Sequence, residues 1–305
     1  MEKERYPGTI LLAVIACLLW SSAFAGIKLG LPYTTPLHFA GVRFFISGLL
    51  VLPLALLRNP GFLRSIGKYL PFILLLSFVQ TFLQYALFYT GISRVPGALG
   101  AIVIGSGPLF VALVAHFTMP GDRLTKQKIA GLSLGIAGIV LVSLGRNSGI
   151  TFGNAAMFGV LILLANNLLS GISNVMIARE KRAVPPLVLS SFSMMIGGAT
   201  LFLVSLPLEG WTPGPKPTVY YLSLGWLSIL SAVAISIWTI LLKRPGVKVS
   251  DLNFWKFLIP VAGAILAWLL LEGESPDLLT VSGMLVTAMA LILVNRGKKA
   301  GKSTP

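Results

Sequence analysis

The stretch that decides the fold is residues 35–68, TPLHFAGVRFFISGLLVLPLALLRNPGFLRSIGK. Residues 35–57 are almost entirely apolar, and the cations Arg58, Arg64 and Lys68 follow directly. An α-helix needs about 20 apolar residues to cross a hydrocarbon core that is ~30 Å thick. A cationic loop next to such a run stays on the cytoplasmic side during insertion. The stretch therefore predicts a transmembrane helix whose C-terminal end faces the cytoplasm.

The same pattern of apolar segments and short gaps continues along the whole chain. Hydrophobic residues make up 55% of the 305 residues and charged residues 11%, whereas soluble domains carry roughly 25% charged residues. The predicted crossings leave no room for a soluble catalytic domain. We expect an all-α polytopic membrane protein with ten transmembrane helices, at residues 9–30, 35–57, 70–90, 96–118, 127–145, 154–177, 187–208, 218–242, 252–271 and 278–294.

The cations lie mainly in alternate gaps between these segments. Of the 24 Lys and Arg residues, three lie inside segments, at Lys28, Arg43 and Lys256, and three lie in one set of gaps, at Arg94, Arg146 and Lys216. The other 18 lie in the alternate gaps and at the two ends of the chain. By the positive-inside rule these 18 face the cytoplasm. We therefore expect a multi-pass protein of the inner membrane with both termini in the cytoplasm.

Composition also bears on partners and cofactors. The net charge of +15 comes from short loops on one membrane face and forms no single basic groove, so we expect no nucleic-acid partner. The one cysteine, Cys17, lies inside the first segment and matches no metal site. We expect no cofactor and no metal. The expected partners are membrane lipids and a small-molecule substrate, and the sequence leaves a homo-oligomer open.

The chain contains an internal repeat. An offset of 152 aligns Pro108 with Pro260 and Gly131 with Gly283, among other pairs. The repeats run over residues 9–145 and 154–295, with five predicted helices in each. Because five crossings is an odd number, the second copy enters the membrane from the opposite side. Two inverted five-helix repeats are typical of secondary transporters, which give alternating access to a site near the midplane.

At this level the chain resembles a known family. The chain resembles the drug/metabolite transporter superfamily, of the EamA-like type. The residues that carry the resemblance are Arg43-Phe44 in the second predicted helix, Pro108-Leu109-Phe110 with Asp122 and Gly131, and Pro260-Val261 with Glu274 and Gly283. The family often has Glu where this chain has Asp122. The resemblance covers about residues 9–143 and 154–295. It implies a ten-helix inner-membrane carrier, often an exporter, of amino acids, amines or other small metabolites.

Polar residues at mid-depth are the candidate binding residues. An amide in hydrocarbon is costly without a partner, so such groups face the bundle interior. Some of them can also act as interhelical hydrogen bonds that only hold the bundle together. Trp20 is too central to be an interfacial anchor and can stack on an organic cation or ring. The candidate substrate-binding residues are Trp20, Ser21, Gln80, Gln84, Asn166, Asn167 and Lys256.

Two prolines are the candidate gating residues. Pro108 and Pro260 lie near the middle of their segments, and each frees the carbonyl four residues earlier, at Ile104 and Lys256. They favour helices that bend at the site, although an ordinary packing kink is the alternative. Lys256 could then attract a substrate carboxylate or reach the membrane surface. Arg43, which is deeper, is expected to brace the bundle by donating to backbone carbonyls.

These patterns favour a secondary transporter over other classes. All nine acidic residues lie in loops or tails, so the segments offer no carboxylate for ion coupling. An intramembrane enzyme would need a nucleophile with its base, paired aspartates or a metal cluster, and we expect no enzyme. The expected function is efflux of a small metabolite, such as an amino acid or a derivative, by alternating access. The alternative is a channel or a lipid scramblase-like protein.

Overall fold

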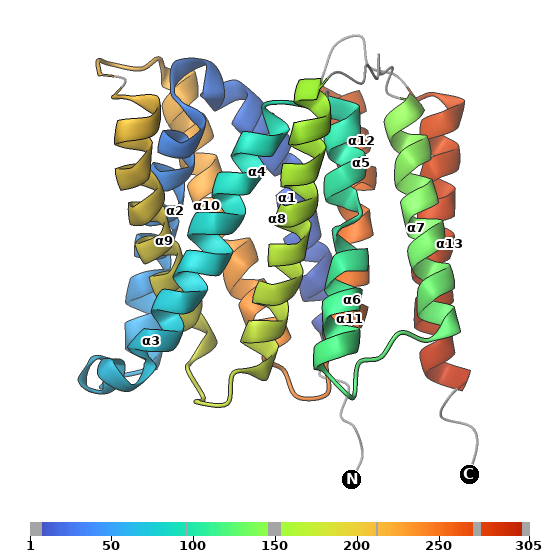
Figure 1. Ribbon diagram of the computed structural model, residues 1–305, viewed down its shortest axis with the longest axis horizontal. Coiled ribbons are helices and arrows are strands. Elements are labelled where there is room, and N and C mark those ends of the chain that lie inside the picture. The colour runs from blue at the N-terminus through green and yellow to red at the C-terminus, as the bar shows by residue number, and fades with distance from the viewer. Residues whose placement is uncertain (1–7, 96, 146–153, 212, 271–275, 301–305) are drawn as a thin grey trace. The chain divides into compact units, whose positions relative to one another are not determined.

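A computed structural model describes residues 8–95, 97–145, 154–211, 213–270 and 276–300. Every regular element in this part of the chain is helical, which confirms the all-α expectation (Figure 1). In a bilayer, helices satisfy their backbone groups without water, which is why long apolar segments adopt this form. The helices are α1 Thr9–Gly30, α2 Pro36–Arg58, α3 Ile66–Leu76, α4 Gln84–Ile92, α5 Gly97–Gly105, α6 Gly107–Thr118, α7 Lys126–Gly145, α8 Asn154–Arg179, α9 Pro186–Glu209, α10 Thr218–Leu242, α11 Val249–Asn253, α12 Leu258–Leu270 and α13 Leu278–Ala300.

Short helices of other types join some of these elements. Three are 3₁₀ turns, at η1 Leu31–Tyr33, η2 Phe62–Ser65 and η4 Phe254–Phe257. The fourth, η3 Ser77–Leu83, is a π-helix that continues α3 into α4. π-helical turns inside α-helices are rare and often mark functional sites. Nothing in the apolar pattern of residues 70–90 predicted one.

By length and composition, eight helical stretches of the described chain can cross a membrane. They are Thr9–Tyr33, Pro36–Arg58, Ile66–Ile92, Gly100–Thr118, Ala156–Arg179, Pro186–Glu209, Thr218–Leu242 and Val249–Leu266. Leu278–Leu293 of α13 is a shorter apolar helix, and α7 is not among the eight. The number of ten crossings therefore stays a prediction.

The chain folds into two compact units, and each takes helices from both halves of the sequence. The first unit comprises Met1–Thr90 and Met176–Gly246, and the second comprises Gly91–Val175 and Val247–Pro305. In the first unit α2 packs along α9, and α10 packs against α1 and α2. In the second unit α7 packs along α13 (Figure 1). The predicted repeats follow one another along the sequence, whereas each compact unit contains helices from both repeats.

Glycines allow the closest of these helix pairs to form. A Cβ built at Gly48 on α2 would lie 2.6 Å from the Ser191 carbonyl oxygen on α9, and one at Gly198 would lie 2.9 Å from the Gly41 carbonyl oxygen. In the second unit a Cβ at Gly283 on α13 would lie 2.6 Å from the Gly138 carbonyl oxygen on α7. Small residues at membrane helix interfaces allow backbones to approach this closely.

Candidate functional site

Arg43 is the centre of a polar cluster inside the first unit. It lies two turns into α2, and only 3% of its surface is exposed. Its Nε donates to the Ser231 hydroxyl on α10 at 2.9 Å, and its Nη1 donates to the Tyr89 hydroxyl on α4 at 3.2 Å. The expectation that Arg43 donates to backbone carbonyls was therefore wrong. Its two recorded partners are hydroxyl groups from two other helices.

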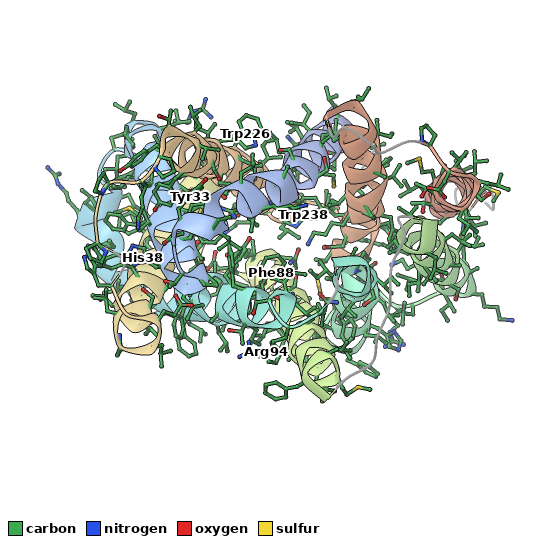
Figure 2. The ribbon with its side chains drawn as sticks, turned by 90° about the horizontal axis from the view of Figure 1, so that it is seen from above. Tyr33, His38, Phe88, Arg94, Trp226 and Trp238 are labelled. Carbon is green, nitrogen blue, oxygen red and sulfur yellow. The ribbon has the colours of Figure 1, made fainter. Side chains whose placement is uncertain are left out.

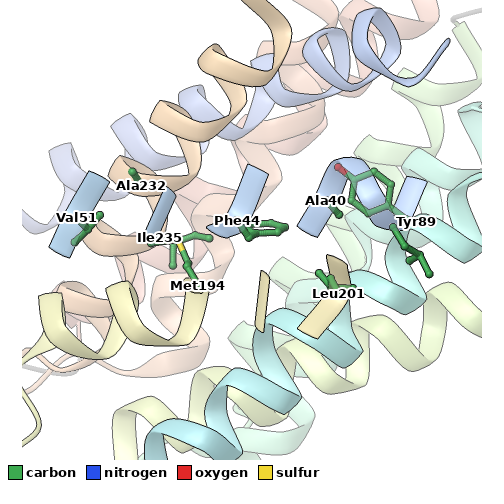
Figure 3. Packing of buried hydrophobic residues seen from close by; sticks show 9 residues of the cluster. Ala40, Phe44, Val51, Tyr89, Met194, Leu201, Ala232 and Ile235 are labelled. Carbon is green, nitrogen blue, oxygen red and sulfur yellow. The ribbon is translucent and has the colours of Figure 1, made fainter. Parts of the chain in front are cut away.

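Aromatic rings surround this guanidinium. Its central carbon lies 4.8 Å from the centre of the Phe44 ring, and the Tyr85 ring lies 4.1 Å from the same ring. We call Arg43, Phe44, Tyr85, Tyr89 and Ser231 the Arg43 cluster. Phe44 and Tyr89 belong to the main apolar core of this unit, which α2, α4, α9 and α10 build together (Figure 3). Position 43 was visible in the sequence as an intramembrane cation, whereas nothing marked Ser231 as its partner.

The predicted site residues of the first unit lie around the same core. Trp20 packs against this core, and its ring meets that of Trp238 edge-on at 5.0 Å. Figure 2 draws the chain from above and labels Trp238 of α10 and Phe88 of α4. Ser21 is buried, but its hydroxyl donates to the Leu18 carbonyl of its own helix at 2.6 Å. Ser21 is therefore the weakest of these candidates.

Gln80 and Gln84 occupy the irregular part of their helix. Gln80 lies in the middle of η3 and Gln84 is the first residue of α4, and both side chains are half-buried. The buried Thr81 and Ser77 beside them face α9, where a Cβ at Gly197 would lie 2.8 Å from the Ser77 carbonyl oxygen. Close packing on that side holds the π-helix in place.

In the second unit, Asn167 on α8 connects to a break between two helices. Its Nδ2 donates to the Val103 carbonyl on α5 at 2.5 Å and to the Ser106 hydroxyl at 3.2 Å. α5 ends at Gly105, and α6 begins at Gly107 with Pro108 in its first turn. A broken helix in a membrane needs groups that satisfy its exposed backbone. Asn167 does this for Val103, so its amide holds the break together.

Asn166 differs from its neighbour. Its Nδ2 donates to Asn167 Oδ1 at 3.3 Å, and its own Oδ1 is buried without a recorded hydrogen-bond partner. Further along α8, Asn174 accepts a hydrogen bond from Asn253 at 3.2 Å, and the Oδ1 of Asn253 is also buried without one. Of the two predicted asparagines, Asn166 has the acceptor that a ligand could use.

The second predicted break is also present. The 3₁₀ turn η4 separates α11 from α12, and Pro260 is the third residue of α12. Lys256 lies in this turn with a half-buried side chain. Both prolines thus stand next to an interruption of the regular helix.

The predicted site residues divide between the two units. Trp20, Ser21, Gln80 and Gln84 lie in the first, and Asn166, Asn167, Lys256, Pro108 and Pro260 lie in the second. Arg43 joins the first group. A single cavity lined by both groups stays a prediction.

A buried charge network that the sequence did not predict lies at one end of the second unit. Lys128 Nζ lies 2.5 Å from Asp122 and 3.4 Å from Asp251. Asp122 also accepts hydrogen bonds from the backbone N–H of Ser250, at 2.8 Å, and from its hydroxyl. Burial alone would raise the pKa of Asp122, but the hydrogen bonds from Lys128 and Ser250 outweigh it and hold the pKa below its usual value. The network ties the loop before α7 to the start of α11.

The first unit has a similar link at its cation-rich end. Lys243 donates to Glu180 at 2.7 Å and to the Val184 carbonyl at 2.8 Å. Burial would raise the pKa of Glu180, yet hydrogen bonds from Lys243 and from two backbone N–H groups keep that pKa low. At the opposite end of the unit, Glu209 accepts from the N–H groups of Leu37 and His38 at 3.0 and 3.2 Å. This carboxylate caps the N-terminus of α2, where the helix dipole favours negative charge.

The comparisons with known proteins agree with this fold. The sequence profile of the EamA-like transporter family matches residues 8–144 and again residues 157–296. A solved crystal structure superposes with a TM-score of 0.82 at 22% identity, over 97% of this chain and 99% of that chain, which shows the shared fold.

Three curated relatives that the chain matches along most of its length are named transporters. The S-adenosylmethionine/S-adenosylhomocysteine transporter of Chlamydia muridarum is 26% identical over 94% of this chain and 92% of its own length. The uncharacterized transporter YvbV of Bacillus subtilis is 24% identical over 99% of this chain and 96% of its own length. The uncharacterized inner membrane transporter YedA of Escherichia coli K12 is 26% identical over 92% of this chain and 88% of its own length. The chain is a multi-pass membrane protein that belongs to the EamA-like transporter family.

Proposed function

We propose that this protein is a secondary carrier of the inner membrane that exports a small metabolite by alternating access. The observation that supports this most is the double match to the transporter family, over both halves of the chain. Polar groups buried in apolar helices, such as Arg43 and Asn166, support a solute pathway through the protein. Ten crossings, with α7 and α13 as two of them, and both termini in the cytoplasm complete the proposed arrangement.

An amino acid or a derivative is the proposed substrate class. The relative from Chlamydia muridarum is named for S-adenosylmethionine and S-adenosylhomocysteine, and both compounds carry an amino acid group. At 26% identity this name supplies compounds to test and does not fix the substrate. The Trp20–Trp238 pair, in which Trp238 is buried and Trp20 half-buried, would suit a substrate with a ring or a positively charged organic group.

The test is flux into proteoliposomes that contain the purified protein. We expect uptake of at least one amino acid or derivative to saturate, and unlabelled solute inside the vesicles to accelerate it. Untargeted comparison of metabolites inside and outside cells, with and without overexpression, selects the compounds. Flux that rises linearly with concentration and shows no acceleration would instead favour a channel. Lipid movement between leaflets without solute flux would favour a scramblase.

A further inference from the structure

Among the described residues of the first unit, no carboxylate contacts the positive charge of Arg43. Within the described residues of the first unit the carboxylates are Glu180 and Glu209, and both bind other groups at the helix ends. Ser231 and Tyr89 are neutral, so they orient the guanidinium without balancing its charge. A buried charge without a counter-charge is strongly destabilising. In a membrane such a residue is commonly a functional group whose partner has to be identified.

The described hydrogen bonds use only some of the guanidinium donors. A guanidinium has five N–H donors, and the described contacts of Arg43 use one on Nε and one on Nη1. The Ser231 hydroxyl is already occupied as a donor, because it donates to the Leu227 carbonyl at 2.8 Å. The Tyr89 hydroxyl is recorded only as the acceptor from Arg43, so its own proton can be donated elsewhere. Three guanidinium N–H groups and the Tyr89 O–H thus remain for one ligand.

The donors fit a carboxylate better than other groups. A carboxylate accepts two parallel N–H bonds from arginine, in a geometry that a hydroxyl or an amide does not reproduce. The Phe44 ring lies against the guanidinium and the Tyr85 ring lies against Phe44, which limits how far the guanidinium can turn. The surrounding apolar core excludes water and thereby strengthens the attraction between opposite charges.

We infer that the Arg43 cluster is an anion site, in which Arg43 and Tyr89 bind the carboxylate of the transported solute. This inference rests on the proposed function, because it gives the solute an acidic group, and it assigns the recognition of that group to Arg43 instead of Lys256. Ser231 is a positioning residue that fixes the guanidinium plane. Binding of the carboxylate would neutralise the one buried cation on α2.

Binding can be measured without knowing the substrate. The probes are three pairs of an acid and its amide: acetate and acetamide, benzoate and benzamide, and L-phenylalanine and L-phenylalaninamide. Thermal unfolding of the purified protein is followed at constant ionic strength, with chloride as the balancing anion. We expect at least one acid, at tenfold above its dissociation constant, to raise the unfolding temperature by about 2 °C. Its amide should leave that temperature unchanged.

Variants assign the effect to the cluster. Arg43→Lys keeps the charge but loses the two-pronged geometry, so the acid should bind at least tenfold more weakly. Tyr89→Phe keeps the ring and should weaken binding a few-fold, which gives a second test if the arginine variant does not fold. Lys28→Gln removes an exposed cation from α1 of the same unit and should leave the acid effect unchanged. Equal stabilisation by acid and amide in the wild type would overturn the inference, and so would an undiminished acid effect in both Arg43→Lys and Tyr89→Phe.

The flux assay separates this inference from the proposed function. Saturable flux of a solute with no acid preference, unaffected by Arg43→Lys, would contradict the anion site while supporting the carrier. Acid-selective stabilisation that depends on Arg43, in vesicles that show no flux of any amino acid or derivative, would support the anion site and contradict the carrier.

Discussion

At the scale of single residues, two neighbouring asparagines have different roles. Asn167 joins α8 to the break between α5 and α6 through two hydrogen bonds. Asn167→Ala should leave the Val103 carbonyl with one fewer partner and cost about 2 kcal/mol of stability. Asn166→Ala should lower transport at a smaller cost in stability, because the Asn166 amide makes one hydrogen bond, at 3.3 Å, and its buried Oδ1 accepts none. Thermal unfolding and membrane abundance, measured for both variants, check the difference. Equal instability of the two would show that the Asn166 amide is structural as well.

Asp122 should make stability depend on pH. Its pKa is lowered in the folded protein from the usual 3.8, because the hydrogen bonds from Lys128 and Ser250 outweigh burial. A carboxyl whose pKa is lowered by folding contributes its stability above the unfolded pKa and loses it as the pH falls through the folded pKa. Asp122→Asn should therefore cost about 3 kcal/mol at neutral pH, and the gap to wild type should close below about pH 4. Unfolding temperatures from pH 7 to pH 3 measure that gap, and a gap that stays constant contradicts the role of the charge.

Sequence reasoning singled out residues whose type is costly in a membrane, and their roles stay predictions. Arg43, Asn166 and Asn167 stood out because a charge or an amide is costly in hydrocarbon and commonly has a partner or a function there. Sequence reasoning could not identify Ser231 or Tyr89 as partners of Arg43, because serine and tyrosine are common in apolar helices and their contacts arise only from packing. It assigned Asn166 and Asn167 the same role, although their surroundings differ.

At the scale of elements, close helix pairs depend on glycines at their contacts. Gly48 and Gly198 allow α2 and α9 to approach, and Gly138 and Gly283 do so for α7 and α13. An added Cβ at any of the four meets backbone atoms that cannot move aside, so Ala should destabilise by about 1–3 kcal/mol. Gly225 on α10 is the matched control, because nothing lies within 4 Å of a Cβ built there. Thermal unfolding of all five Ala variants checks this, and a loss at Gly225 as large as at Gly48 would contradict it.

The two prolines provide a test of motion. Pro108 and Pro260 each stand beside an interruption of a helix, at Ser106 and at η4. Replacing either by Ala restores a backbone N–H and should favour a continuous helix. If these helices bend during transport, both variants should slow exchange more than they weaken binding. Turnover and affinity, measured separately in proteoliposomes, decide between bending and simple packing, since unchanged turnover in both variants would leave the prolines as packing features.

The helices show which local features the apolar pattern of the sequence can predict and which it cannot. The apolar segment at residues 70–90 predicted one helix, and the structure has α3, the π-helix η3 and α4 in that place. Hydropathy reports burial in lipid and is insensitive to an added residue in one turn, so it cannot reveal a π-helix. The predicted breaks at Pro108 and Pro260 were visible because proline removes a backbone donor at a known position.

At the scale of the whole molecule, the distribution of charge supports the predicted orientation. In the first unit, contacts of Lys243 with Glu180 and of Arg244 with Thr9 gather the cation-rich segments at one end. The opposite end is where Glu209 caps α2. In the second unit, Lys128 lies with Asp122 and Ser250 at one end. In the first unit the cations thus gather at one end, as the positive-inside rule predicts for a cytoplasmic face.

This polarity leads to a test of topology. Reporter fusions after residues 65, 125, 181 and 247 should report the cytoplasm, because each of these residues lies in a cation-rich gap between apolar segments. Fusions after residues 33, 149 and 213 should report the outside. The fusion after residue 149 is the decisive one, because it tests whether α7 crosses the membrane from the cytoplasmic loop at residue 125 to an outer loop. If it reports the cytoplasm, α7 does not cross and the second repeat is not inverted as proposed. A fusion at the C-terminus that reports the periplasm would equally exclude ten crossings, because an even number returns the chain to the side where it began.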